Sequence, residues 1–267
     1  ILKLAQFFKN VRFIIIQNSY RPPGFYGKIT LKETDLLITY SPLVKFNLSS
    51  NEIPMKSFKY FGGNEISDFL KNKVILISQY RQYSNDESIK QEKQYYSEID
   101  NGLLFEDNPN FLYYQEEFLN FLSNYFNKNE KQIFYKSASR EQTTFVKNNE
   151  TSYFKKYNIS EIEVSCDDIY ASDSNEIYIC FDSTMIFELI SFNKKILIYP
   201  HRKLFVNTSY GPHIKVFVEK YPELVINKNF IDFEKKFDSL NKISQIEYDS
   251  KYQIFNSMKE FSLNKYI

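Results

Sequence analysis

Four short, strongly apolar segments, separated by polar or helix-patterned stretches, constrain the fold of this chain most. They are VILIS (74–78), QIFYK (132–136), EIYICF (176–181) and ILIY (196–199). Each has the length of a β-strand, and continuous apolar runs of this kind are typical of strands that are buried on both faces. Strands that alternate with helices predict an α/β fold with a mostly parallel sheet and helices on both of its faces.

The clearest helix is predicted over residues 113–128. Phe118, Leu119, Leu122 and Phe126 recur there at helical spacing, on or near one face. Shorter helices are expected at 3–10, 151–158, after 184 and after 230. Further strands are expected at 11–16, 35–41, 162–166 and 223–227, with a helical or irregular stretch from 42 to about 52, a linker or short helix at 64–73, and a solvated loop at Asp167 and Asp168.

Charge and cysteine content narrow the class of protein. The 34 basic and 33 acidic residues give a net charge of +1, so no global field attracts nucleic acid. Cys166 and Cys180 are too few for a disulfide framework and lack metal-ligand spacing, which favours a reducing cytoplasm. No apolar run reaches membrane-spanning length. The chain begins at Ile1, in what reads as the end of a helix, so we expect further residues upstream in the natural protein.

Three loops are candidates for a ligand site. In parallel sheets, ligands bind outside the carboxyl ends of the strands. That rule selects SQYR (78–81), KSASREQ (136–142) and DST (182–184), each directly after an apolar strand. There is no GxGxxG motif, no P-loop and no internal repeat.

The DST loop carries the most specific pattern. Ser183 and Thr184 lie where a strand turns into a helix, so their hydroxyls and the free backbone N–H groups favour an anionic ligand. Glu188 follows Thr184 by one helical turn and can reach a sugar or ribose hydroxyl from the same face. The alternative is purely structural: a Ser or Thr before a helix is a common N-cap.

In their order along the chain, IIIQNSYR, TDLLITYSP, KYFGGN, VILISQYR, YKSASRE and FDSTMIFELISFNKKILIYP resemble bacterial surface-carbohydrate glycosyltransferases of the GT-B type. Within that group the chain is most similar to capsule and lipopolysaccharide sugar transferases that use CMP-activated Kdo or sialic acids. The resemblance spans residues 11 to 200. It implies two Rossmann-like domains that face a cleft: residues 1–68 as the remainder of the N-terminal, acceptor-side domain, and 69–267 as the C-terminal nucleotide-sugar-binding domain.

The resemblance also implies roles for single residues in the C-terminal domain. Ser183 and Thr184 would bind a phosphate, and Glu188 would bind ribose or sugar hydroxyls. Relatives carry K-x-H-P-R-E at the YKSASRE position, where the histidine supports the donor phosphate; this chain has Ala138 and Ser139 in place of His-Pro. The remaining donor-side candidates are Ser78, Gln79, Arg81, Lys136, Arg140 and Glu141.

On the acceptor side, the implied candidates are Gln17, Asn18 and Arg21, which follow the first strand. The resemblance implies a nucleotide-sugar donor, a glycan or lipid-linked glycan acceptor, and a cytoplasmic location with peripheral association at the inner membrane. It implies no cofactor and no metal, and there is no DxD motif at a strand end. The catalytic base or nucleophile is not assigned.

Other functions remain open from the sequence. One is a nucleotide-sugar epimerase or a glycerophosphate-type transferase, because these enzymes use similar two-domain cores. Another is a non-catalytic protein that binds a nucleotide or a glycan, which the alanine and serine at 138 and 139 favour. Nucleotide binding without turnover would separate the last alternative from the enzymes.

Overall fold

The structure is a computed structural model of the 267-residue chain. It describes residues 14–16, 36–40, 52–55, 68–78, 80, 111–137, 144–172, 175–181, 185–199, 221–227 and 230–252. All structural statements below concern these residues.

A five-stranded parallel sheet organises the larger part of the described chain, in the order β6-β5-β4-β7-β8. Its strands are β4 (Val74–Ile77), β5 (Ile133–Lys136), β6 (Ser160–Glu161), β7 (Ile177–Cys180) and β8 (Lys195–Ile198). Every residue of β4, β7 and β8 is buried, which explains why these strands read as continuous apolar runs. The predicted parallel α/β sheet is confirmed, with the order typical of a Rossmann-like fold.

A second, three-stranded parallel sheet lies earlier in the chain, in the order β1-β2-β3. It consists of β1 (Ile14–Ile16), β2 (Leu36–Tyr40) and β3 (Glu52–Met55). The first two strands were predicted, but β3 was not, because Pro54 interrupts its short apolar pattern. The two sheets fall on either side of residue 68, and the domain boundary there stays a prediction.

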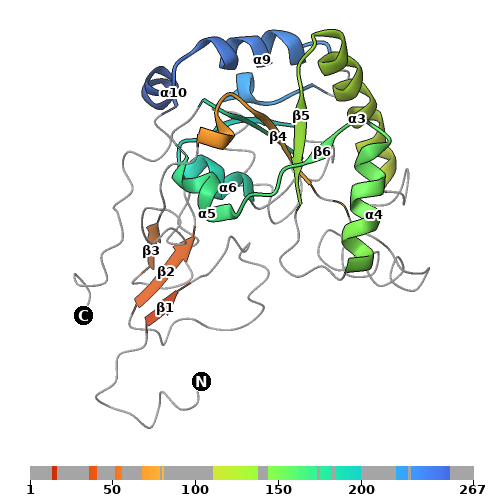
Figure 1. Cartoon of the computed structure of the whole chain (residues 1–267). Helices are drawn as coiled ribbons and strands as arrows, with labels where there is room; N and C mark the ends of the chain where they lie inside the picture. Colours follow the sequence, from red (N-terminus) through yellow and green to blue (C-terminus); the bar gives the residue numbers. More distant parts are fainter. Residues whose placement is uncertain are drawn as a thin grey trace, which may run out of the picture.

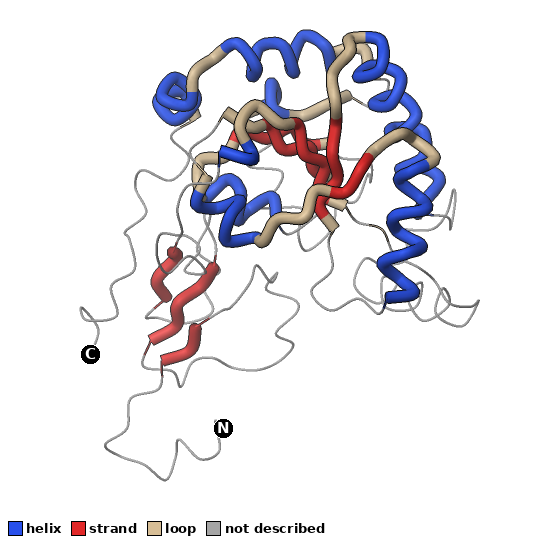
Figure 2. The backbone as a smooth tube through the Cα atoms, viewed as in Figure 1, coloured by secondary structure: helices blue, strands red, loops and turns tan. Residues whose placement is uncertain are grey.

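Helices surround the larger sheet. The α-helices are α3 (Phe111–Lys128), α4 (Thr144–Lys155), α5 (Cys166–Ala171), α6 (Met185–Ser191), α9 (Phe233–Lys242) and α10 (Gln245–Lys251), and the 3₁₀ turns are η3 (Asp68–Leu70) and η4 (Pro222–Leu224). Figure 1 shows α3, α4 and α9 along one side of the sheet and α5 with α6 on the other. The tube in Figure 2 shows the strands enclosed between these helices. This arrangement follows from connections that leave β4 in one direction along the sheet and β7 in the other, since connections between parallel strands are right-handed as a rule.

The core under α3 is aromatic, as the helical pattern predicted. Phe118, Leu119 and Leu122 are completely buried. The ring of Phe118 stacks on Tyr199 with centroids 4.3 Å apart and meets Phe181 edge-on at 5.4 Å. Tyr199 and Phe181 follow β8 and β7 directly, so this cluster ties α3 to the carboxyl end of the sheet.

The segment 162–166 was predicted to be a strand, and this prediction was wrong. The strand β6 comes earlier, at Ser160–Glu161, and Cys166 begins the helix α5. Ser165 is the N-cap of that helix: its hydroxyl accepts a hydrogen bond from the Asp168 N–H, and the Asp168 carboxylate accepts one from the Ser165 N–H. This reciprocal capping box also corrects the solvated loop expected at Asp167 and Asp168, which lie in the first helical turn.

Two other elements differ from the sequence-based expectation. The strand expected at 223–227 is replaced by η4 and a single bridge between Val225 and Ile198. Proline at the first position of η4 favours this turn over a strand. The helix expected at 151–158 begins earlier, at Thr144, and ends at Lys155.

Candidate functional site

The carboxyl ends of three adjacent strands form the candidate site. Ile77 of β4 lies opposite Lys136 of β5 on one side and Cys180 of β7 on the other. The loops that follow these strands are the three that the sequence selected. They emerge side by side, because β5, β4 and β7 are neighbours in the sheet.

The chain connections diverge at this edge. The connection after β4 leads through α3 to β5, whereas the connection after β7 leads through α6 to β8, on the opposite side of β4. The gap between two such diverging connections is the usual ligand site of an open parallel sheet. Ser78 stands at this point, and its N–H donates a 2.9 Å hydrogen bond to the Lys136 carbonyl.

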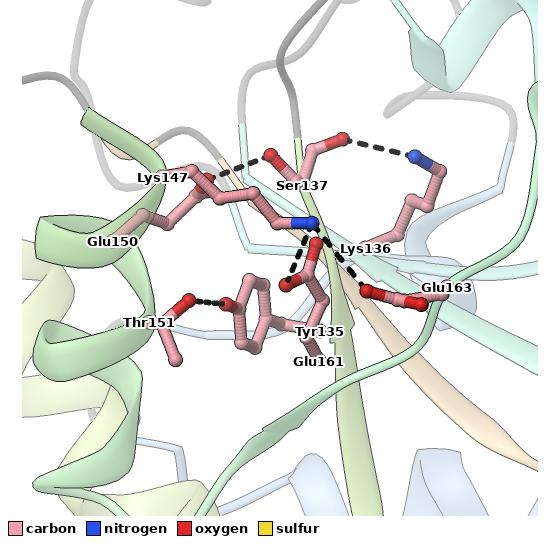
Figure 3. A network of polar contacts seen from close by, with 8 residues as sticks. All are labelled: Tyr135, Lys136, Ser137, Lys147, Glu150, Thr151, Glu161 and Glu163. Atoms are coloured by element: carbon pink, nitrogen blue, oxygen red, sulfur yellow. Dashed lines mark hydrogen bonds and ion pairs between the residues drawn. The ribbon is translucent and has the colours of Figure 1, made fainter. Parts of the chain in front are cut away.

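A buried glutamate joins the ends of β4 and β5. Glu150, on α4, is completely buried. One carboxylate oxygen accepts a hydrogen bond from the Ser78 hydroxyl, and the other accepts a 2.7 Å hydrogen bond from the Ser137 hydroxyl. Figure 3 shows Glu150 reaching from its helix to Ser137 at the end of β5. A single carboxylate therefore holds the residues that directly follow β4 and β5.

The Ser78 hydroxyl takes part in two hydrogen bonds. It donates to Glu150 and accepts a 3.0 Å hydrogen bond from the Tyr80 N–H, which turns the chain immediately after β4. The Tyr80 ring packs against Tyr153 of α4 with centroids 5.1 Å apart. Burial, and secondarily the nearby Glu150 carboxylate, raises the pKa of Tyr80. Ser78 is fully buried, so in this structure it shapes the loop, and direct contact with a ligand stays a prediction.

Lys136 lies at the end of β5 and is partly exposed. Its ammonium donates a 3.4 Å hydrogen bond to the carbonyl of Ser137, as Figure 3 shows. A second lysine of the same network, Lys147 on α4, lies 3.4 Å from Glu163 and 3.8 Å from Glu161. Of these two lysines, Lys136 is the one at the strand end where an anionic group would bind.

Glu188 lies in the first turn of α6, as predicted, but its carboxylate is buried. It accepts a hydrogen bond from the Tyr170 hydroxyl of α5. The Tyr170 ring in turn stacks on Phe192 with centroids 4.6 Å apart. A carboxylate has about four acceptor positions, so a ribose contact would share Glu188 with Tyr170.

All of the remaining predicted site residues lie outside the described residues. These are Gln17, Asn18, Arg21, Gln79, Arg81, Arg140, Glu141, Ser183 and Thr184. Ala138 and Ser139 also lie outside them. Their roles stay predictions, although the topology fixes the strands from which the loops at 79–81, 138–143 and 182–184 leave.

Sequence reasoning missed Glu150 and Ser137. The signal was present for Glu150: Tyr153, Phe154 and Tyr157 follow it by three, four and seven residues and are buried. A helix started at 144 instead of 151 would have placed Glu150 on this buried face. The hydrogen bonds of Glu150 to Ser78 and Ser137 could not have been predicted, because they depend on how α4 lies over the sheet.

The described residues hold no group of three His, Cys, Asp or Glu side chains that could bind a metal ion. Among the same residues, no helix combines the length and the apolar character needed to cross a membrane. No protein-family model matches the chain, and comparison with curated proteins finds no match.

Proposed function

We propose that this protein is a glycosyltransferase of the GT-B type, which moves a sugar from a nucleotide-activated donor to a growing surface polysaccharide. The supporting observation is the convergence of three loops at the carboxyl edge of a parallel sheet, at the point where its connections diverge. Sites of this kind bind nucleotides in Rossmann-like folds.

The proposal gives each loop a role. Ser183 and Thr184, at the turn before α6, would bind the donor phosphates through hydroxyls and backbone N–H groups. Lys136 lies at the end of β5, and β5 and β7 are the two neighbours of β4 in the sheet. Its ammonium would add a positive charge that stabilises the leaving nucleotide. Glu150 would position the loops after β4 and β5 through Ser78 and Ser137, without touching the donor.

The donor that the sequence resemblance favours is a CMP-linked acidic sugar, and the acceptor a glycan or lipid-linked glycan at the cytoplasmic face of the inner membrane. A protein that binds a nucleotide without turnover is the alternative. The positions where relatives carry His-Pro favour it, because the side chain of Ala138 cannot donate a hydrogen bond or transfer a proton.

Donor cleavage tests the enzyme proposal without knowledge of the acceptor. The protein would be incubated with CMP-, UDP- and GDP-sugars, and free nucleotide would be measured over time. We expect slow release from one donor class. We also expect release to fall roughly tenfold or more in Lys136→Ala, because a charge near the leaving group is lost, but not in Lys155→Ala, an exposed lysine at the end of α4. Nucleotide binding without release from any donor would instead establish the non-catalytic alternative.

A further inference from the structure

A separate, positively charged pocket lies at the amino ends of β4 and β5, opposite to the carboxyl ends where the candidate site lies. Its cavity has a volume of about 340 Å³ and is bounded by the turns before β4 and β5 and by α9. Val74, one of its lining residues, is the first residue of β4, whereas Ser78 follows the last one. At about 3.3 Å per residue, the length of β4 separates this pocket from the candidate site by roughly 10 Å or more.

The charged residues that line the pocket are all basic. Lys71, Lys73 and Lys131 line it, and none of its lining residues is acidic. Within the described part of the chain, no ion pair involves any of these three lysines. Like charges gathered around one cavity repel one another, and a bound anion would relieve this repulsion.

Aromatic rings hold two of the ammonium groups beside the cavity. The Lys73 ammonium lies 4.8 Å from the ring centroid of Phe69 and 4.9 Å from that of Phe134. The Lys131 ammonium lies 5.2 Å from the ring centroid of Phe237, which is buried on α9. Such cation–π contacts restrict where the two charges lie while leaving their N–H donors available.

Amides complete the lining. Asn72, Gln132 and Asn241 come from three different segments and can each donate hydrogen bonds to oxygen atoms. Asn72 has a left-handed backbone with φ of 59°, which forms the tight turn between η3 and β4. The lining thus combines positive charge, amide donors and the apolar surfaces of Phe134 and Phe237.

We propose that this pocket binds a small phosphorylated molecule, of a size between a sugar phosphate and a mononucleotide. Lysine binds phosphate as a point charge, and amides can bond the remaining oxygens or sugar hydroxyls. A volume of about 340 Å³ is at the lower end of the range for small-molecule sites, which matches a ligand of this size. The site is distinct from the donor site and does not depend on the proposed transfer activity.

The test is calorimetric titration of the full chain with glucose 6-phosphate and with inorganic phosphate. We expect saturable binding of glucose 6-phosphate that weakens with salt, because exposed charges are screened. In Lys73→Gln/Lys131→Gln the affinity should fall by about tenfold or more. The matched control is Lys155→Gln/Lys156→Gln, which makes the same change of net charge at two exposed positions, the last residue of α4 and the one that follows it, and should bind as the wild type does.

Two further measurements separate this site from the donor site. Ser183→Ala/Thr184→Ala should leave glucose 6-phosphate binding unchanged, because those residues follow the carboxyl end of β7, whereas the pocket lies at the amino ends of β4 and β5. In the unmutated protein, nuclear magnetic resonance should show ligand-dependent shifts of the Asn72 and Gln132 amides. Absence of saturable binding would overturn the proposal. An equal loss of affinity in both lysine variants, or shifts confined to residues outside the pocket, would overturn it as well.

Discussion

The buried carboxylate of Glu150 accepts a hydrogen bond from the hydroxyl of Ser78, 72 residues away in the sequence. Because the same carboxylate also holds Ser137, one side chain of α4 links the ends of two neighbouring strands where their loops begin. The positions of these two loops in the candidate site therefore depend on a residue of α4 that belongs to neither loop.

Removal of this carboxylate should destabilise the protein. In Glu150→Ala the buried Ser78 hydroxyl loses its acceptor and a cavity forms, so we expect the free energy of unfolding to fall by roughly 2–4 kcal/mol. Urea denaturation measures this loss. Glu163→Ala is the control: its side chain is 81% exposed and pairs with exposed Lys147, so the change should stay within about 0.5 kcal/mol.

A double-mutant cycle tests the hydrogen bond itself. If Ser78 and Glu150 interact as described, the effects of Ser78→Ala and Glu150→Ala should not add, because the second change removes a partner already lost. Strict additivity, or a Glu150→Ala protein as stable as the wild type, would contradict the role assigned to Glu150.

The capping box of α5 should stabilise the protein in a pH-dependent way. Hydrogen bonds from the Ser165 side chain and backbone lower the pKa of Asp168 below its ordinary value. A lowered pKa in the folded state means that the contribution is complete above the unfolded pKa, about 4, and is lost as the pH falls through the folded value. Ser165→Ala should therefore cost about 1 kcal/mol at neutral pH.

The measurement is the difference in unfolding free energy between Ser165→Ala and the wild type, followed from neutral to acidic pH. This difference should shrink as Asp168 becomes protonated in both proteins. A difference that stays constant with pH would show that the cap does not depend on the charge of Asp168.

Buried tyrosines should make the fold sensitive to alkali. Burial raises the pKa of Tyr135 and Tyr199 to about 12, and partial burial raises the pKa of Tyr125 to about 12. Burial also raises the pKa values of Tyr178 and Tyr248. Since each folded pKa lies above the unfolded value of about 10, the stability that these groups contribute is complete below that pH and is lost as the pH rises through the folded values.

Phenolate absorbance and circular dichroism, recorded in one alkaline titration, test this expectation. Part of the tyrosine signal should appear only as the helical signal is lost, well above the midpoint of the same chain unfolded in guanidinium. Complete ionisation near pH 10 with the helical signal intact would contradict the burial of these rings.

The sequence predicted the central sheet well for a physical reason. The residues of β4, β7 and β8 are all buried, and all of them except Lys195 are apolar or aromatic or cysteine, which left a clear pattern of short apolar runs. For α3, the one-sided contact of Phe118 and Leu122 with the core likewise produced a clear helical period.

The failures have a physical explanation too. At Ser165, the capping box with Asp168 starts a helix, and this local hydrogen bonding prevailed over the strand-like alternation of Ile162 and Val164. For the candidate site, the sequence predicted three loops and single residues within and near them, but not the buried glutamate that joins two of these loops. The buried centre of the site at Glu150 arises from contacts between distant segments, which the local sequence pattern does not encode.

We propose that the carboxyl ends of the strands in the larger sheet bind a nucleotide through Ser183 and Thr184, which precede α6 in the sequence. Calorimetric titration of CMP, CDP, UDP and GDP into the wild type and into Ser183→Ala/Thr184→Ala tests it most directly. A parallel titration of Lys73→Gln/Lys131→Gln removes any contribution from the pocket at the other edge. We expect one nucleotide to bind tightly to the wild type, to lose this binding in the serine–threonine variant and to retain it in the lysine variant. Binding of none of the four, or equal binding to the wild type and the serine–threonine variant, would contradict it.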